Sequence, residues 1–310
     1  MRLRKRELFR ILRYSPHAGQ ELVHRSRAKR RVLACGTRFG KSTCGVMETI
    51  AGLIVPGEST LGWLVGPTYD LTERIFSKVI ALLNEHFPHR IVAFVPRERR
   101  IVVLNLSGGL SELRAKSADR PESLLGEALT FLVVDEAASI RDDVWDEFLA
   151  PRLIDRDGWS LLLSTPHGRG WFHREFRRGQ MNRDPDYESW QAPTRDNPHI
   201  AAALIEAERA RLSADTFAEK YEAQFLGPPE PCEACGYPSP SAIGLAMVED
   251  DEELPACKLC GQPIDSAGKT LVQLDANGRT WLSVMRIHTE GLTAQERTNL
   301  RDWRTPELPA

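Results

Sequence analysis

A glycine-containing stretch between a short apolar run and a helical pattern holds the first candidate residues for chemistry. Its eight residues are Gly36, Thr37, Arg38, Phe39, Gly40, Lys41, Ser42 and Thr43. Small residues in such a turn let backbone N–H groups surround a phosphate, and the N-terminus of the following helix adds a partial positive charge. Lys41 then reaches the β- and γ-phosphates of a nucleotide, and the Ser42 hydroxyl binds Mg²⁺. The pattern departs from the strict motif at Cys35, six residues before Lys41, where a glycine is usual.

Two carboxylates come directly after a second apolar run, Phe131–Val134. At the end of a buried strand, Asp135 can hold the water shell of Mg²⁺, and Glu136 can orient or deprotonate an attacking water. The alternative is an ordinary acidic pair that opens a loop. The phosphate-binding pattern at the end of an earlier strand favours the catalytic interpretation.

Ser164 and Thr165 end a third apolar run and precede Pro166. Because parallel strands end at the same edge of a sheet, these hydroxyls are expected beside the γ-phosphate, where they can sense hydrolysis. A plain strand-to-loop turn is the alternative.

Four cysteines form two C-x-x-C pairs in the C-terminal part of the sequence, Cys232 with Cys235 and Cys257 with Cys260. Four thiolates in a tetrahedral array are typical of a structural Zn²⁺ site with no open position for catalysis. An iron–sulfur cluster and unliganded thiols are the alternatives. The spacing predicts a small zinc-ribbon domain with four cysteine ligands, in which the metal stabilises a chain segment too short for a large core.

The elements that must position these residues alternate between strand and helix patterns. Apolar runs predict strands at Arg31–Cys35, Leu61–Val65, Thr130–Val134 and Ser160–Leu163, and a hairpin formed by Ile101–Leu106 and Leu110–Ala115. Helices are predicted at Ser42–Ile54, Leu71–Phe87, Pro198–Leu212 and Ser213–Phe225. Continuous apolar runs are typical of parallel strands that are covered on both faces. This alternation predicts an α/β fold with ligands at the carboxyl ends of a parallel sheet.

Composition changes at Gly227–Pro231, where three prolines in four residues form a stiff break. We therefore predict a basic N-terminal helix and a following segment over residues 1–30, a phosphate-binding domain over residues 31–227 and the zinc ribbon over residues 228–310. Residues 1–31 contain eleven Lys or Arg and two Glu, whereas residues 228–310 contain seven Lys or Arg and thirteen Asp or Glu. A polyanion is attracted by the first segment and repelled by the last. A solvated helix face is the alternative for the basic segment.

Taken in order, these motifs resemble the ATPase domain of the large terminase subunit, the DNA-packaging motor of tailed phages. Further points of resemblance are Gly66–Tyr69, Leu125-Gly126 and the aromatic residues of Phe217–Phe225. The resemblance covers residues 10–227 and implies a P-loop NTPase fold of the RecA/ASCE-like type. It also implies roles for single residues: Gln20 contacts adenine, Asp135 assists Mg²⁺, Glu136 orients water, and Ser164 and Thr165 link the γ-phosphate state to movement.

The family's loop arginine most often stands one position earlier, where this chain has Thr37. Arg38 therefore either stabilises charge in the transition state or has a structural role. Five further arginines follow Pro166: Arg169, Arg174, Arg177, Arg178 and Arg183. They form either a face that contacts DNA phosphates or an exposed helix with acidic counter-ions.

The resemblance implies ATP hydrolysis coupled to translocation of double-stranded DNA by a homo-oligomeric ring on a portal. Large terminases normally continue into a nuclease domain. Nothing after Gly227 has the length or the strand-borne aspartates for one, so we expect no nuclease activity and a separate nuclease or small terminase subunit as partner. No apolar run is long enough for a membrane span, which favours the cytoplasm of a host cell.

Two other functions fit part of the pattern. A helicase-like or DNA-remodelling ATPase also carries Asp-Glu-Ala after a strand, but it needs a second nucleotide-facing domain that the last 80 or so residues do not provide. A zinc-stapled, non-catalytic assembly scaffold is the other possibility. The intact Lys41, Ser42, Asp135 and Glu136 count against it.

Overall fold

The computed structural model describes residues 4–55, 58–181, 183–227, 246–249 and 269–272. Internal contacts divide the chain into two units, Met1–Leu226 and Gly227–Ala310. In the second unit, the described residues form an antiparallel pair of strands, β9 (Ala246–Glu249) and β10 (Lys269–Val272). None of the helices in the described part of the chain has the length and apolar character needed to cross a membrane.

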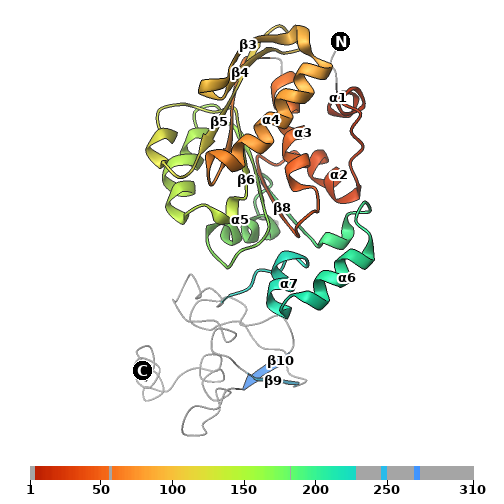
Figure 1. The fold of residues 1–310 in the computed structure, drawn as a ribbon. Helices are drawn as coiled ribbons and strands as arrows, with labels where there is room; N and C mark the ends of the chain where they lie inside the picture. The colour runs from red at the N-terminus through yellow and green to blue at the C-terminus, as the bar shows by residue number, and fades with distance from the viewer. Residues whose placement is uncertain (1–3, 56–57, 182, 228–245, 250–268, 273–310) are drawn as a thin grey trace, which may run out of the picture. The chain divides into compact units, whose positions relative to one another are not determined.

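A mixed, mostly parallel sheet forms the centre of the first unit (Figure 1). Its eight strands are β1 (Arg30–Cys35), β2 (Thr60–Gly66), β3 (Ile91–Val95), β4 (Arg100–Leu104), β5 (Leu110–Ser117), β6 (Phe131–Asp135), β7 (Trp159–Ser164) and β8 (Tyr187–Ala192). They lie in the order β3-β4-β5-β2-β6-β7-β1-β8. The pairs β3–β4 and β4–β5 are antiparallel, and the other pairs are parallel. The parallel strands therefore present their carboxyl ends at one edge.

Seven α-helices surround this sheet in the described residues. They are α1 (Lys5–Ile11), α2 (Ala18–Arg25), α3 (Lys41–Ile54), α4 (Tyr69–His86), α5 (Trp171–Gln180), α6 (Ala202–Arg211) and α7 (Ala214–Lys220). Thr68 begins α4 by accepting a hydrogen bond from the Leu71 N–H through its side chain, and Ser213 begins α7 in the same way with Thr216. Such N-caps satisfy backbone donors that the first helical turn leaves free.

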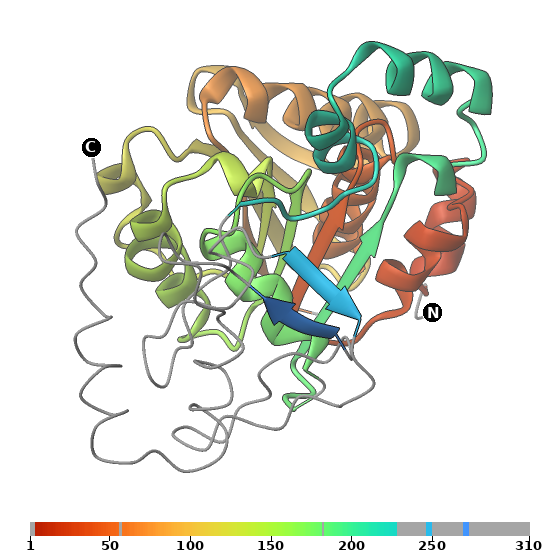
Figure 2. The same ribbon diagram turned by 90° about the horizontal axis from the view of Figure 1, so that it is seen from below.

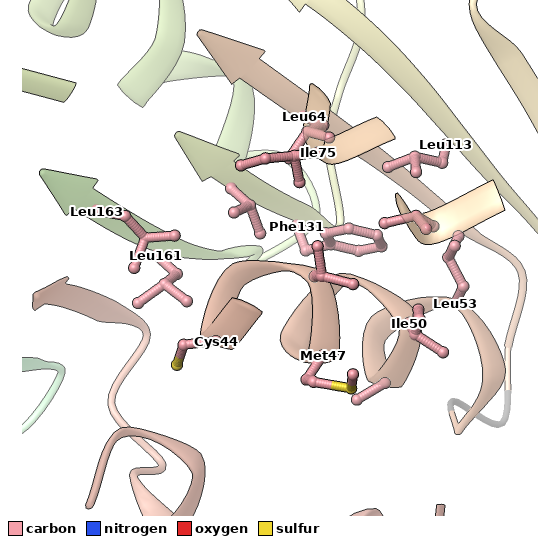
Figure 3. Packing of buried hydrophobic residues seen from close by; sticks show 14 of the residues in the cluster. Cys44, Met47, Ile50, Leu53, Leu64, Ile75, Leu113, Phe131, Leu161 and Leu163 are labelled. Atoms are coloured by element: carbon pink, nitrogen blue, oxygen red, sulfur yellow. The ribbon is translucent and has the colours of Figure 1, made fainter. Parts of the chain in front are cut away.

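One face of the sheet packs against α3 and α4 (Figure 3). Phe131 of β6 and Leu161 and Leu163 of β7 project toward α3, whereas Met47 lies on the side of α3 turned away from Phe131; these residues and Cys44 belong to one core cluster. All five side chains are at most 5% exposed. Burial of large apolar side chains contributes about 1.5–3 kcal/mol each, so this layer fixes the helix that follows the phosphate loop.

The opposite face is covered by α5 and by short helical turns within residues 121–153. Seen from below in Figure 2, α1 and α2 (red) and the 121–153 segment (yellow-green) lie on different sides of the sheet. Val32, Leu132 and Leu162 belong to this second core. Because neighbouring residues of one strand face opposite sides of the sheet, β1, β6 and β7 each contain a continuous apolar run.

The α/β fold and the strands beside the phosphate loop are as predicted, whereas β3, β8, α2 and α5 were not predicted. The predicted helix Ser213–Phe225 is also too long, because α7 ends at Lys220 and Ala223 adopts a positive φ of 58°. The zinc ligands predicted at Cys232, Cys235, Cys257 and Cys260 lie outside the described residues.

Candidate nucleotide-binding site

The phosphate loop runs from the end of β1 to the start of α3. Gly40 is the N-cap of α3 and has a φ of 103°, a left-handed conformation that glycine adopts without strain. At Gly36 a Cβ atom would lie 2.4 Å from Thr194 Oγ1 and 2.6 Å from the Tyr221 carbonyl oxygen. The loop therefore needs glycine at these two positions for different reasons, backbone conformation at Gly40 and close packing at Gly36.

Lys41 is only 6% exposed and bonds to the backbone around it. Its Nζ donates to the carbonyl oxygens of Cys35 (3.1 Å) and Gly36 (3.0 Å) and to Thr165 Oγ1 (2.9 Å). Burial lowers the pKa of Lys41, while Cys35, Glu136 and Asp135 act in the opposite direction. The lysine thus stands at the junction of the loop and the end of β7.

Asp135, the last residue of β6, lies beside the first turn of α3. Ser42 Oγ donates to Asp135 Oδ2 over 3.2 Å. The other carboxylate oxygen, Oδ1, is buried and accepts no hydrogen bond from the described residues. Burial, followed by the neighbouring Glu136 charge, raises the pKa of Asp135 to about 6. A buried oxygen lacking a partner, next to a hydroxyl, fits the oxygen ligands that Mg²⁺ prefers.

Glu136 follows directly in a left-handed conformation, with φ 51° and ψ 41°. This backbone region is uncommon for a residue other than glycine, and such strain of about 1–3 kcal/mol concentrates at functional sites. The side chain is half-buried, and its charge contributes to the pKa values of both Lys41 and Asp135. The predicted catalytic glutamate is therefore electrostatically coupled to the phosphate loop.

Ser164 and Thr165 have different surroundings, although they are neighbours. Thr165 Oγ1 accepts the hydrogen bond from Lys41 Nζ, so its hydroxyl reaches the phosphate loop. Ser164 is 1% exposed and accepts the backbone N–H of Ala138 over 3.1 Å. Ser164 therefore holds the turn that follows Glu136, and only Thr165 contacts the loop itself.

Gln20 lies on α2 beside the end of the phosphate loop. Its Nε2 donates to the Gly40 carbonyl oxygen (3.1 Å), and its Oε1 accepts the His17 N–H (3.2 Å). The His17 ring in turn contacts the Phe39 carbonyl oxygen through Nε2, over 2.9 Å. Gln20 is 4% exposed, and these two bonds use one of the two donors and one of the two acceptor positions of its carboxamide.

Hydrogen bonds from the distant segment 192–197 to the phosphate loop were not predicted from the sequence. Thr194 Oγ1 donates to the Thr37 carbonyl oxygen and Asn197 Nδ2 to that of Arg38, both over 2.7 Å. The Thr37 N–H bonds to the Lys220 carbonyl at the end of α7. The loop is thus held from outside by elements more than 150 residues later, and no local motif signals those partners.

The remaining loop residues are placed as follows. Arg38 is exposed and has a φ of 61°, with its carbonyl fixed by Asn197. Phe39 is fully buried and packs edge-on against His17, whereas Thr43 is exposed on the first turn of α3. These contacts give Phe39 a packing role. They leave both interpretations of Arg38 open.

Two of the five arginines after Pro166 have acidic partners on or near α5 among the described residues. Arg174 bonds to Asp146 over 2.6 Å, and Arg178 lies 3.8 Å from Asp184. Arg178 also stacks on Tyr187. This arrangement favours an exposed helix with counter-ions over a free cationic face.

Among the described residues, no group of three or more His, Cys, Asp or Glu could hold a metal ion.

Comparisons of the sequence and of the structure with known proteins both find similar proteins. No model of a known protein family matches the chain. The large terminase subunit of Thermus phage G20c is 36% identical over 247 residues, which cover 71% of this chain and 50% of that protein. The chain thus spans half the length of this relative.

Solved structures agree with the sequence comparison. The large terminase ATPase domain of Thermus phage P74-26 has a TM-score of 0.65 and 34% sequence identity, covering 73% of this chain and 100% of that one. The large terminase of another thermophilic bacteriophage, solved in complex with ADP, has a TM-score of 0.58 at 12% identity, covering 69% of this chain and 54% of that one. At this lower identity the similarity concerns the fold.

Proposed function

The chain belongs to the family of large terminase subunits, and its first unit has the fold of their ATPase domain; from this premise we propose that it binds and hydrolyses ATP. The observation that carries the proposal is the convergence of Lys41 and Ser42, at the start of α3, with Asp135 at the end of β6 and Thr165 after β7. An ATP hydrolysis assay with Lys41→Ala as the blank tests it.

The roles of the site residues follow from their surroundings. The Lys41 ammonium exchanges its carbonyl partners for oxygens of the β- and γ-phosphates, and backbone N–H groups of the loop bind the same anion. Glu136 orients the attacking water and accepts its proton. The hydrogen bond between Lys41 and Thr165 changes with the presence of the γ-phosphate, because Lys41 binds both. Arg38 is exposed at the loop and is available to stabilise developing charge.

Mg²⁺ is held by Ser42 and Asp135 in this proposal. When bound, Mg²⁺ would neutralise part of the phosphate charge. Asp135 must then be ionised, although burial raises its pKa to about 6. Gln20 binds the adenine base with the donor and acceptor that its bonds to Gly40 and His17 leave available.

A basic groove at the same edge of the sheet is our candidate surface for double-stranded DNA. It has a volume of about 560 Å³ and is lined by Tyr69, Arg97, Glu98, Arg99, Arg100, Arg114, Ala115 and Lys116. In the described part of the chain, Arg97 and Lys116 form no ion pair, unlike Arg174 and Arg178 of α5. Unpaired cations that replace counterions along phosphates provide sequence-independent affinity for DNA.

Translocation of DNA by a homo-oligomeric ring, mounted on a portal, completes the proposal. Membership of the large terminase family supports it. We assign no cleavage step to the described residues, and we propose a separate nuclease or a small terminase subunit as a partner. For Cys232, Cys235, Cys257 and Cys260 we retain the proposal of a structural Zn²⁺ site, which is supported by their spacing alone.

A further inference from the structure

A buried carboxylate on α3 lies apart from the phosphate-binding residues. Glu48 stands seven residues after Lys41, and its side chain is 1% exposed. It accepts hydrogen bonds from Lys5 Nζ (2.9 Å), His24 Nδ1 (2.6 Å) and Arg31 Nη1 (2.6 Å). Burial raises the pKa of Glu48, but these three partners more than offset it and hold the pKa below its usual range.

Each partner of Glu48 belongs to a different element. Lys5 lies in α1, His24 in α2 and Arg31 in β1, so one carboxylate attaches all three elements to α3. Arg31 and His24 are as buried as Glu48, with side chains 4% and 2% exposed. Removal of one member of a buried ion pair leaves an uncompensated charge, so displacement of one of these elements from Glu48 is costly.

The His24 ring has little freedom to move. Phe9 and Tyr14 pack edge-on against it, with ring centroids 4.7 and 5.6 Å away, and the Tyr14 hydroxyl lies 3.1 Å from Nε2. Both ring nitrogens are therefore engaged, Nδ1 by Glu48 and Nε2 by Tyr14. His24 of α2 is thus held by Glu48 of α3 together with Phe9 and Tyr14.

Gln20 lies one turn before His24 on the same helix. It bonds to the Gly40 carbonyl at the very start of α3, while His24 bonds to Glu48 two turns further along α3. Residues four apart lie on the same face of a helix, so α2 is attached to α3 at two consecutive points of one face. A shift of α2 at the His24–Glu48 bond therefore also moves Gln20 relative to Gly40.

We propose that Glu48 is a positioning residue for nucleotide recognition, which holds α2 against α3 and thereby keeps Gln20 at the phosphate loop. This inference rests on the proposed function of Gln20 as a contact to the base. Glu48 itself touches no nucleotide. Loss of its charge therefore weakens ATP binding without removing any group that takes part in hydrolysis.

The test compares ATP binding by calorimetry in the full chain for the wild type, Glu48→Gln, Gln20→Ala and the double variant. We expect each single variant to raise the Kd for ATP about tenfold, which corresponds to about 1.4 kcal/mol. The double variant should be no weaker than the weaker single one, because both changes disturb the same contact. Glu48→Gln should also raise KM while leaving kcat within about twofold of the wild type.

Glu21→Gln is the matched control. Glu21 also joins α1 to α2, through Arg6, but this ion pair is at the surface. Its loss should leave the Kd for ATP unchanged, since exposed ion pairs contribute only about 0–1 kcal/mol. If thermal unfolding shows that Glu48→Gln does not fold, His24→Phe replaces it, because this variant keeps the ring and leaves Glu48 paired with Lys5 and Arg31.

Folded Glu48→Gln and His24→Phe proteins with wild-type Kd values would overturn the inference, as would additive effects of Glu48→Gln and Gln20→Ala. A wild-type Kd for Gln20→Ala alone would overturn it too, because Gln20 would then not be the contact that Glu48 positions. Absence of ATP binding by the unaltered chain would instead overturn the proposed function, and this inference with it.

Discussion

Lys41 Nζ lies 2.9 Å from Thr165 Oγ1, although 124 residues separate the two in sequence. The contact joins the phosphate loop after β1 to the end of β7, two strands that are direct neighbours in the sheet. A hydroxyl in this position experiences any change in the partners of Lys41. In the proposed mechanism, this contact connects the occupancy of the phosphate site with the segment that leads into α5.

Thr165→Val should lower kcat for ATP about tenfold, because the isosteric side chain removes the hydroxyl that orients Lys41. Thr165→Ser keeps the hydroxyl and should retain most of the activity. Steady-state hydrolysis by the three proteins, at saturating ATP, measures the difference. Equal kcat values for the valine variant and the wild type would show that the contact has no part in turnover.

Asp135→Asn should stabilise the protein against urea while abolishing Mg²⁺-dependent hydrolysis. Burial raises the pKa of Asp135 from its ordinary 3.8 to about 6. Between these values the folded state retains a proton that the unfolded state has released, so stability falls as pH rises through this window. At about pH 7.5 the ionised side chain costs up to about 3 kcal/mol, which the amide avoids.

Urea unfolding of both proteins without Mg²⁺, at about pH 7.5 and about pH 5, checks this sign. The free energy of unfolding of Asp135→Asn should exceed that of the wild type at the higher pH. This difference should be smaller at the lower pH, where the wild-type carboxyl is mostly protonated. A variant less stable than the wild type at the higher pH would contradict the assigned environment of Asp135.

The basic groove makes a prediction about salt dependence. Arg97→Gln combined with Lys116→Gln should weaken binding to double-stranded DNA and reduce the slope of log K against log salt concentration by about 2, one for each lost phosphate contact. Arg174→Gln combined with Arg178→Gln is the control, because those arginines already have acidic partners. A larger loss of slope in the control would place the DNA on α5 instead.

The paired cysteines predict about one zinc ion per chain. Metal analysis of the purified protein should find it, and Cys257→Ser with Cys260→Ser should lose it. Cys44→Ser is the control, because Cys44 is buried beside β7 in the first unit and belongs to no C-x-x-C pair. Full-length, folded protein without zinc would refute the ribbon, and iron in its place would support a cluster.

The sequence was informative where burial is complete and much less so at the sheet edges. β6 reads as a strand because all five of its residues are buried. β8 is an edge strand with the exposed Glu188 and Gln191, so its composition gives no continuous apolar run. α5 is rich in charged residues, and only Trp171, Phe172 and Phe176 supply its apolar contacts with the core.

The sequence predicts which residues at the strand ends form the site. It does not predict the hydrogen bonds that hold the phosphate loop in place. Lys41 and Ser42 follow β1, and Asp135 ends β6. These two parallel strands lie on either side of β7, so their carboxyl ends meet at the same edge of the sheet. Thr194 and Asn197 reach the loop carbonyls across more than 150 residues. Hydrogen bonds between distant side chains and backbone depend on tertiary packing, which leaves no periodic signal in the sequence.

The measurement that tests the central claim most directly is ATP hydrolysis by the full chain, with and without linear double-stranded DNA. The wild type should hydrolyse ATP faster when DNA is present, Lys41→Ala should be inactive, and Glu136→Gln should bind ATP while its kcat falls by at least about 100-fold. Hydrolysis by Lys41→Ala at the wild-type rate, or no hydrolysis by the wild type under either condition, would contradict the account.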